Sequence, residues 1–287
     1  MAAIRDATLD DLDAIFDLLT VRSRAAFGVS QVQRRYVEQE LQDASSESWV
    51  AVDGRLVGFA RLGPTHVLTL AAADPEVNDL LLAHGEAAAR RRGFDHVIVY
   101  AFAEDAPLWS LVERSGFTHE RDVLRMWRVL DDALPEPRWP DGVRVRTYED
   151  ADAEPVHALL DEQYASWDTD YVRMSHPDWL SFMTQHDEFD PRLWFLVERG
   201  GELVACALHW REDAGRGWVK DIVVRESERG RGLGKALLHH GFRAYKERGA
   251  DRVGLKVDST NPTGAPQLYE RVGFAIDQRQ AIWQKPL

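Results

Sequence analysis

The two halves of the chain repeat one order of local features, and this repeat limits the possible folds more than any other property of the sequence. Ile4–Leu19 and Val145–Leu160 each read as a strand end, an acidic turn and an amphipathic helix. Further along, "RRRGFDHVIVYAF" corresponds to "KERGADRVGLKVD", and "LWSLVERSGF" corresponds to "PQLYERVGF". Several matches in the same order indicate a tandem duplication of a domain of about 140 residues, which lies within the usual range of domain sizes.

The joint between the two copies is predicted in the stretch "LPEPRWPDG", Leu134 to Gly142. Its three prolines remove backbone donors and disfavour helix, so it reads as a stiff linker. We therefore predict a first domain over residues 1–134, a linker over 135–142 and a second domain over 143–287. Each half alternates strands and helices, which predicts an α/β or α+β fold.

Composition excludes several classes of function. The formal net charge is −13, which argues against a nucleic-acid partner because phosphate binding depends on clustered Lys and Arg. No apolar run reaches the roughly 18 residues of a membrane span, and the start lacks the features of a signal peptide, so a cytoplasmic protein is expected. Cys206 is the only cysteine and is interpreted as a core residue. No metal site is expected, because no His/Asp/Glu cluster has metal-ligand spacing.

The stretch "RGRGLGKALL" follows the apolar strand "WVKDIVV" and precedes a helix expected from about Leu233 to Arg248. Glycines let the chain approach a ligand closely, and the first turn of a helix offers unpaired N–H groups to a phosphate. Positive side chains at 229, 231 and 235 add charge there. The residues expected to hold an anion are Arg229, Gly230, Arg231, Gly232, Leu233, Gly234 and Lys235.

Two common phosphate-binding motifs do not match this loop. A P-loop requires a glycine five residues before Gly234 and Ser or Thr after Lys235, but the chain has Arg229 and Ala236 there. A dinucleotide fingerprint requires the third glycine one residue later. Neither nucleotide hydrolysis nor NAD binding is predicted.

The pattern R-x-x-G-x-G, formed by Arg229, Gly232 and Gly234, resembles the GCN5-related N-acetyltransferase (GNAT) superfamily. The downstream "VDSTNPTGAPQLYERVGF" is similar to that family's strand, Asn, short helix, Tyr and Gly-Phe ending. The resemblance covers residues 143–287. It implies acetyl-CoA as the coenzyme, with its pyrophosphate at the loop. It also implies two tandem GNAT-like domains, each with a mixed, mostly antiparallel sheet flanked by helices.

The first half keeps this frame without the loop. Alignment places Asp74–Asn78 over Gly230–Gly234, where no glycine remains and the acidic side chains would repel a pyrophosphate. Alignment of the two Gly-Phe endings places Val112 over Tyr269. The first half is predicted to be a degenerate, non-catalytic copy that shapes the acceptor cleft or serves as scaffold.

The resemblance also implies roles for single residues. The main chain of Ile222, Val223 and Val224 would hold the acetyl and pantetheine amides. Asn261 would contact the pantetheine arm, or cap the helix before Pro262. Tyr269 would be the general acid that protonates the departing thiolate, the alternative being a tyrosine simply packed under its helix.

The general base is less defined by the sequence. Asp221, in "KDIVV", stands where several relatives have an acidic residue. It could deprotonate the amine directly or through water, bind a cationic substrate, or form an ion pair. His209 is a second candidate base because imidazole titrates near neutral pH.

Acceptor recognition is expected from the segment "QYASWDTDYVRMSHPDWLSFMTQHDEFDPRLW". Its aromatic and acidic residues suit a cationic amine, although the aromatics equally fit the core of a helical pair. These residues are Tyr164, Trp167, Asp168, Asp170, Tyr171, Trp179, Phe182, Asp187 and Glu188. "HW" at His209 and "PDGVRVRTY" are similar to the mycothiol synthase type of tandem GNAT, whose first half keeps a Gly-rich loop; no substrate is inferred from this partial similarity.

The sequence thus predicts an acetyl-CoA-dependent N-acetyltransferase that moves an acetyl group by direct attack to the primary amine of a small molecule. The alternatives are transfer of a longer acyl group, acetylation of a protein amine, and a non-catalytic acyl-CoA sensor. The identity of the amine and the oligomeric state are left open.

Overall fold

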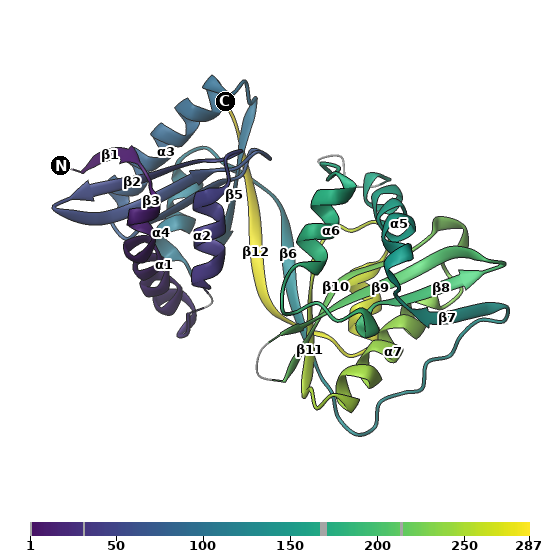
Figure 1. Cartoon of the computed structure of the whole chain (residues 1–287). Coiled ribbons are helices and arrows are strands. Elements are labelled where there is room, and N and C mark those ends of the chain that lie inside the picture. Colours follow the sequence, from purple (N-terminus) through teal and green to yellow (C-terminus); the bar gives the residue numbers. More distant parts are fainter. Residues whose placement is uncertain (1, 31, 167–170, 213–214) are drawn as a thin grey trace. The chain divides into compact units, whose positions relative to one another are not determined.

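The structure is a computed structural model that describes residues 2–30, 32–166, 171–212 and 215–287. One order of helices and strands occurs twice along the chain (Figure 1). The first series is β1 (Ala3–Asp6), α1 (Leu12–Phe27), α2 (Arg34–Gln42), β2 (Glu47–Asp53), β3 (Arg55–Leu62), β4 (Leu68–Ala72), α3 (Pro75–Arg91), β5 (His96–Phe102), α4 (Ala106–Arg114) and β6 (Thr118–Val129). The second is β7 (Val143–Thr147), α5 (Ala153–Ala165), α6 (His176–Thr184), β8 (Phe195–Arg199), β9 (Glu202–Glu212), β10 (Arg216–Val224), α7 (Leu233–Glu247), β11 (Arg252–Asp258), α8 (Ala265–Arg271) and β12 (Ala275–Pro286).

The same ion pair marks the entry to the first helix of each series. Arg5 lies 2.6 Å from Asp11, and Arg146 lies 2.6 Å from Asp152. Each aspartate also accepts a hydrogen bond from the backbone amide three residues earlier. Equivalent residues therefore make equivalent contacts, and the duplication extends to side-chain geometry.

The boundary between the two compact units does not lie at the proline-rich stretch, where the sequence predicts it. One unit contains residues 1–123 and 279–287, and the other contains residues 124–278. The predicted linker at 135–142 lies inside the second unit, where Trp139 packs on the core and Arg199 donates to the Asp141 carbonyl at 2.7 Å. β6 and β12 each begin in one unit and end in the other. The last strand of each series thus completes the unit built by the other.

In the first unit, β1, β2, β3 and β4 form an antiparallel sheet in that order. One apolar cluster lies between this sheet and α1, and another lies between the sheet and α3. β5 pairs antiparallel with the end of β12, from Phe102 opposite Gln280 to His96 opposite Pro286.

In the second unit, β7, β8, β9 and β10 are antiparallel neighbours, and β11 joins β10 in parallel. The helices α5 and α6 cover one face of the sheet and α7 covers the other (Figure 1). The second unit is therefore a mixed, mostly antiparallel sheet, and the first unit adds one parallel bridge, Val67 to Ile98, to its antiparallel strands. Helices flank the sheets of both units, which confirms the predicted fold class. Within the described residues, no helix is both long enough and apolar enough to cross a membrane.

Candidate active site

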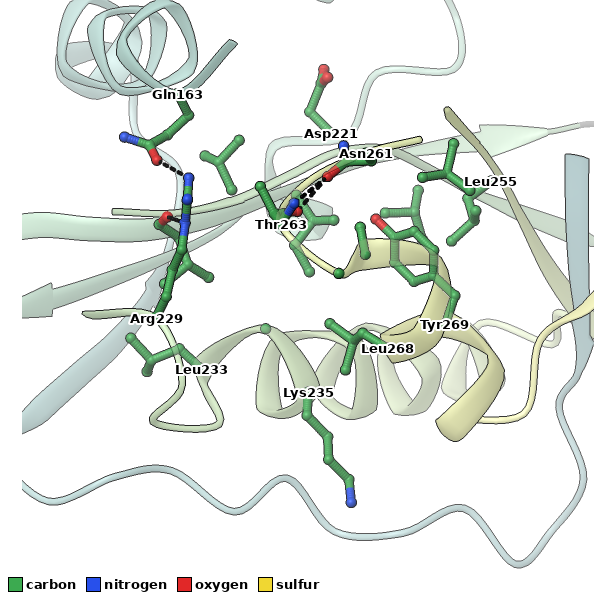
Figure 2. A pocket seen from close by; sticks show the side chains of 18 of the residues that line it. Gln163, Asp221, Arg229, Leu233, Lys235, Leu255, Asn261, Thr263, Leu268 and Tyr269 are labelled. Atoms are coloured by element: carbon green, nitrogen blue, oxygen red, sulfur yellow. Dashed lines mark hydrogen bonds between the residues drawn. The ribbon is translucent and has the colours of Figure 1, made fainter. Parts of the chain in front are cut away.

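A pocket of about 500 Å³ lies in the second unit, between the ends of β10 and β11, the loop before α7, and α8 (Figure 2). It brings together most of the residues that the sequence singles out. Those that line it are Asp221, Ile222, Val223, Val224, Arg229, Gly230, Gly232, Leu233, Gly234, Lys235, Asn261 and Tyr269. His209 and Arg231 do not belong to its lining.

The pocket exists because two parallel strands separate. β10 and β11 pair only from Arg216 opposite Arg252 to Val219 opposite Leu255. Both strands then continue, β10 to Val224 and β11 to Asp258. Alternate backbone groups of a strand point to opposite edges, so the outer half of β10 bonds β9 along one edge and presents N–H and C=O groups to the opening along the other.

A β-bulge in β10 decides which side chains reach the opening. Val219 lies opposite His209 on β9, whereas Asp221 lies opposite Leu208, so Lys220 is the extra residue. An extra residue shifts the alternation of side chains between the two faces. Val219 accordingly belongs to the core beneath α7, while Asp221 and Val223 turn toward α5 on the other face.

Asp221 is held by a tyrosine from α5. The side chain is 8% exposed, and its Oδ1 accepts a hydrogen bond of 2.5 Å from the Tyr164 hydroxyl. Lys220 Nζ lies 3.6 Å from Oδ2 of the same carboxylate. Burial, and then the charge of Asp221, raise the pKa of Tyr164 well above its usual value, so the tyrosine remains the donor. A carboxylate has about four acceptor sites on its two oxygens, so Asp221 can still accept a hydrogen bond from a ligand.

Tyr269 enters the pocket from α8, and its ring packs against Phe274. The residue is only 6% exposed. Burial raises its pKa above the ordinary value for a phenol, and the charge of Asp221 raises it further. The hydroxyl is therefore protonated at neutral pH, and it makes no hydrogen bond to any described residue. Within the part of the chain that the structure describes, it is a proton donor without a protein partner.

The loop before α7 presents backbone rather than side chains. Gly230 and Gly232 have φ values of +75° and +87°, which side-chain-bearing residues rarely adopt. Gly232 is the N-cap of α7 and no side chain caps the helix, so its first N–H groups remain available to a ligand. A Cβ at Gly234 would lie 3.2 Å from Leu268, so glycine here lets α8 approach α7 closely.

The three cations of the loop differ in their placement. Arg229 donates from Nε to the Val224 carbonyl at 3.2 Å and from its terminal nitrogen to Gln163 at 2.6 Å (Figure 2). Its guanidinium therefore ties the end of β10 to α5. Arg231 is exposed and lies 3.7 Å from Glu228. Lys235 extends away from the pocket in Figure 2.

Asn261 does not cap α8, whose N-cap is Gly264. Its side-chain oxygen accepts hydrogen bonds from the amide and the hydroxyl of Thr263, at 3.0 and 2.5 Å (Figure 2). The residue closes the turn that leads into α8 and also lines the pocket. The helix-cap alternative is thus replaced by a cap on the preceding turn.

His209 is placed on the wrong face to act as a base. The ring is completely buried between β9 and α7, against Phe195 and Tyr245. A Cβ at Gly241 would lie 2.7 Å from the ring, so this glycine makes room for it. Burial, and then His240, lower the pKa of His209 to about 3. The bulge explains the difference, since it sends Asp221 to the pocket while His209 stays beneath α7.

The predicted acceptor segment is divided between core and surface. Trp179 is buried in the core beneath α5 and α6, whereas Phe182 is 54% exposed. Tyr171 donates a hydrogen bond to Asp161 and stacks on Tyr164, with ring centroids 5.6 Å apart. Trp167, Asp168 and Asp170 lie outside the described residues. Asp187 and Glu188 do not line the pocket.

Two side chains at the site, Gln163 and Lys220, were given no role of their own from the sequence, and Tyr164 was expected only as one of the aromatic residues of the acceptor segment. Gln163 and Tyr164 come from α5, some 60 residues before the strand and loop that they contact. Lys220 became significant only through the bulge. Tyr164 follows Leu160 at helical spacing, and this single pattern does not distinguish a pocket residue from a core residue.

A cluster of possible metal ligands lies in the first unit. Donor atoms of His66, Asp95 and His96 lie within 4.8 Å of one another, an arrangement that sequence spacing does not predict. The His96 ring lies 2.6 Å from the Asp95 carboxylate, and the His66 ring lies 3.2 Å from the His96 carbonyl. None of these three residues lines the pocket.

Comparison with known proteins agrees with the geometry. The model of the acetyltransferase (GNAT) family matches residues 153–274. A mycothiol acetyltransferase of Thermobispora bispora is 34% identical over 248 residues, which cover 76% of each chain. A GCN5-related N-acetyltransferase from Sphaerobacter thermophilus is similar in structure, with a TM-score of 0.80, 26% identity and coverage of 99% of this chain and 95% of that one.

A tandem GNAT protein from the clavulanic acid biosynthesis pathway shares the fold, with a TM-score of 0.77 at 17% identity, over 100% of this chain and 98% of that one. The resemblance expected from the loop and from the Asn–Tyr segment is confirmed, including its tandem form and the likeness to the mycothiol enzymes. The chain is therefore an N-acetyltransferase that belongs to the GNAT family.

Proposed function

We propose that this enzyme transfers an acetyl group from acetyl-CoA to the primary amine of a small molecule, at one active site in the second unit. The supporting observation is that three features share one pocket: the unpaired edge of β10, the uncapped start of α7, and the buried phenol of Tyr269. Acetyl-CoA supplies a thioester-activated acetyl group and a thiolate leaving group.

The lining fits this coenzyme. A diphosphate requires several convergent N–H groups and no side chain in front of them, which glycines at 230 and 232 and the first turn of α7 provide. An extended arm with amide groups requires an unpaired strand edge, which Ile222–Val224 provide. Arg229 would hold the loop in place through Val224 and Gln163.

Two side chains would handle the protons. Asp221 would take a proton from the attacking amine, directly or through water, with Tyr164 fixing the orientation of its carboxylate. Tyr269 would give its proton to the sulfur as the carbon–sulfur bond breaks. Backbone N–H groups on the edge of β10 would stabilise the charge on the carbonyl oxygen.

We assign no catalysis to the first unit. At the start of α3, which corresponds to α7, the Asp74 carboxylate accepts a hydrogen bond of 2.8 Å from the Glu76 amide. The Asp74 carboxylate therefore occupies the position at the start of α3 where a phosphate would otherwise bind. Beside β4, which corresponds to β10, Arg22 donates to the Leu70 carbonyl at 2.9 Å. Both positions that would receive a coenzyme are taken by side chains of the protein.

A thiol-release assay tests the function. Acetyl-CoA is supplied with a panel of small primary amines, including amines related to mycothiol because relatives carry that name. Longer acyl-CoAs and a lysine-containing peptide are run in parallel. We expect acetyl transfer to a small amine; preference for the peptide or for a longer acyl chain would replace the proposal, and coenzyme binding without thiol release on any amine would contradict it.

A further inference from the structure

We propose that Tyr245 on α7 is a positioning residue for the acetyl transfer. Its hydroxyl holds β9 and β10 in the bulged pairing that directs the carboxylate of Asp221 into the pocket. The inference rests on the proposed function, in which Asp221 takes the proton of the attacking amine. Tyr245 does not line the pocket, so it acts through the backbone of β10 and not by contact with a substrate.

The hydroxyl of Tyr245 lies between the two strands. It accepts a hydrogen bond of 3.0 Å from the Trp218 N–H on β10, and its oxygen lies 2.8 Å from the Trp210 carbonyl on β9 and 2.9 Å from the Trp218 carbonyl. A phenol has one hydrogen, so it donates to one of these carbonyls at a time. Trp218 and Trp210 are direct partners. The hydroxyl therefore bridges β9 and β10 at backbone groups of the kind that opposite residues of an antiparallel pair exchange.

The chain makes room for this side chain. Tyr245 is 2% exposed, and a Cβ at Gly217 would lie 2.5 Å from its ring. The ring of His209 packs edge-on against it, with centroids 5.3 Å apart. The hydroxyl is thus held between the strands by packing as well as by hydrogen bonds.

The bulge follows two residues after this contact. Lys220 is the extra residue, and pairing resumes with Asp221. Side chains alternate along a strand, so without the extra residue Asp221 would point to the same face as Val219, into the apolar core beneath α7. Tyr245 contacts both the N–H and the C=O of Trp218, and it thereby fixes the backbone from which β10 enters the bulge.

The two ends of α7 then have separate roles. The start of the helix, at Leu233, lines the pocket beside the glycine loop. Tyr245 lies about three turns further on, roughly 18 Å along the helix axis. Loss of its hydroxyl should therefore change the placement of Asp221 and leave the coenzyme site as it is.

Tyr245→Phe tests the inference in the full-length enzyme, with acetyl-CoA and the amine that is acetylated fastest in the thiol-release panel. We expect kcat to fall about 10-fold, because a small displacement of a reacting group is costly, while the dissociation constant of acetyl-CoA changes less than about 2-fold. In an Asp221→Asn background the same replacement should change kcat less than about 2-fold, since no carboxylate remains to be positioned.

Two further variants separate positioning from stability. Gly217→Ala keeps the hydroxyl but displaces the ring, so it should reduce kcat in the wild-type background and not in Asp221→Asn. Leu130→Ala is the matched control, because Leu130 is buried in the same cluster beneath α7 but lies outside β9 and β10 and does not line the pocket. It should lower the melting temperature with kcat within about 2-fold of the wild type.

Two results would overturn the inference alone: full kcat in Tyr245→Phe, or equal losses from this replacement in the wild-type and Asp221→Asn backgrounds. Full kcat in Asp221→Asn would instead refute the proposed base together with the inference. The proposed transfer itself would fail separately, if no primary amine released thiol from acetyl-CoA with the wild-type enzyme.

Discussion

The hydroxyl of Tyr164 on α5 donates a hydrogen bond of 2.5 Å to Asp221 on β10, which joins two elements 57 residues apart at the pocket. The bond orients the Asp221 carboxylate beside the opening between β10 and β11. The orientation of the candidate base thus depends on a helix outside the glycine loop.

Replacement of Tyr164 by Phe should weaken both the fold and the reaction. The buried carboxylate of Asp221 would lose a donor, which reduces the free energy of unfolding by about 1–3 kcal/mol. Loss of its orientation should reduce kcat about 10-fold, and Asp221→Asn should reduce it about 10²-fold or more. Chemical denaturation and steady-state rates measure the two effects.

Tyr171→Phe is the matched control, since it removes a tyrosine–aspartate bond to Asp161 instead of Asp221. We expect reduced stability with a much smaller change in kcat. Equal kcat losses in the two variants would contradict a specific role for the bond to Asp221.

Tyr269→Phe should reduce kcat about 10²-fold while the affinity for acetyl-CoA changes little, because only the proton donor is removed. Burial raises the pKa of the wild-type phenol, so it stays protonated above its usual range and loses its proton only in strong alkali. In the wild-type enzyme, kcat should therefore not fall on account of Tyr269 up to about pH 10. Calorimetric affinity and a pH–rate profile test this, and a variant with full kcat would exclude Tyr269 as the acid.

Gly232→Ala should weaken coenzyme binding through the backbone. With φ at +87°, alanine is strained there by about 1–2 kcal/mol, and relief of that strain would turn the N–H groups away from the pocket. We expect the acetyl-CoA dissociation constant to rise about 10-fold.

Gly249→Ala at the other end of α7 has a similar φ of +83° and open space around the Cβ, but does not line the pocket. It should destabilise the protein similarly without a change in affinity. If both variants bound acetyl-CoA like the wild type, the loop would not be the diphosphate site.

The sequence was most informative where function depends on local backbone. The glycines at 230, 232 and 234 and the tyrosine of α8 lie in one pocket because the short motifs that contain them also set the local chain direction. The repeat could equally be recognised from the sequence, because the ion-paired residues Arg5–Asp11 and Arg146–Asp152 have the same spacing.

What sequence reasoning missed depends on distant pairing. β5 and β11 occupy equivalent places in their series. The order of elements along the chain therefore does not show which of the two final strands, β6 or β12, pairs beside β5. The domain boundary predicted at the prolines therefore differs from the boundary between the compact units. A bulge at Lys220 changes the faces of all later side chains in β10, which explains why His209 and Asp221, both candidate bases, lie on opposite faces.

His209 should make the protein sensitive to acid. Its pKa is about 3 in the folded protein, against 6.5 as the ordinary value expected on unfolding. Between pH 3 and pH 6.5 the unfolded chain therefore binds one more proton than the folded protein. The free energy of unfolding is at its full value above about pH 6.5 and falls as the pH is lowered toward 3, by about 1.4 kcal/mol per pH unit. His209→Leu should flatten this slope in denaturation experiments from pH 4 to 7; an unaltered slope would mean that another group is responsible.

The most direct measurement is a crystal structure of the complete chain with coenzyme A. We expect one coenzyme per chain, with its diphosphate against the backbone of residues 230–235 and its thiol beside Tyr269. A diphosphate bound elsewhere, or a second coenzyme at the start of α3, would contradict this expectation.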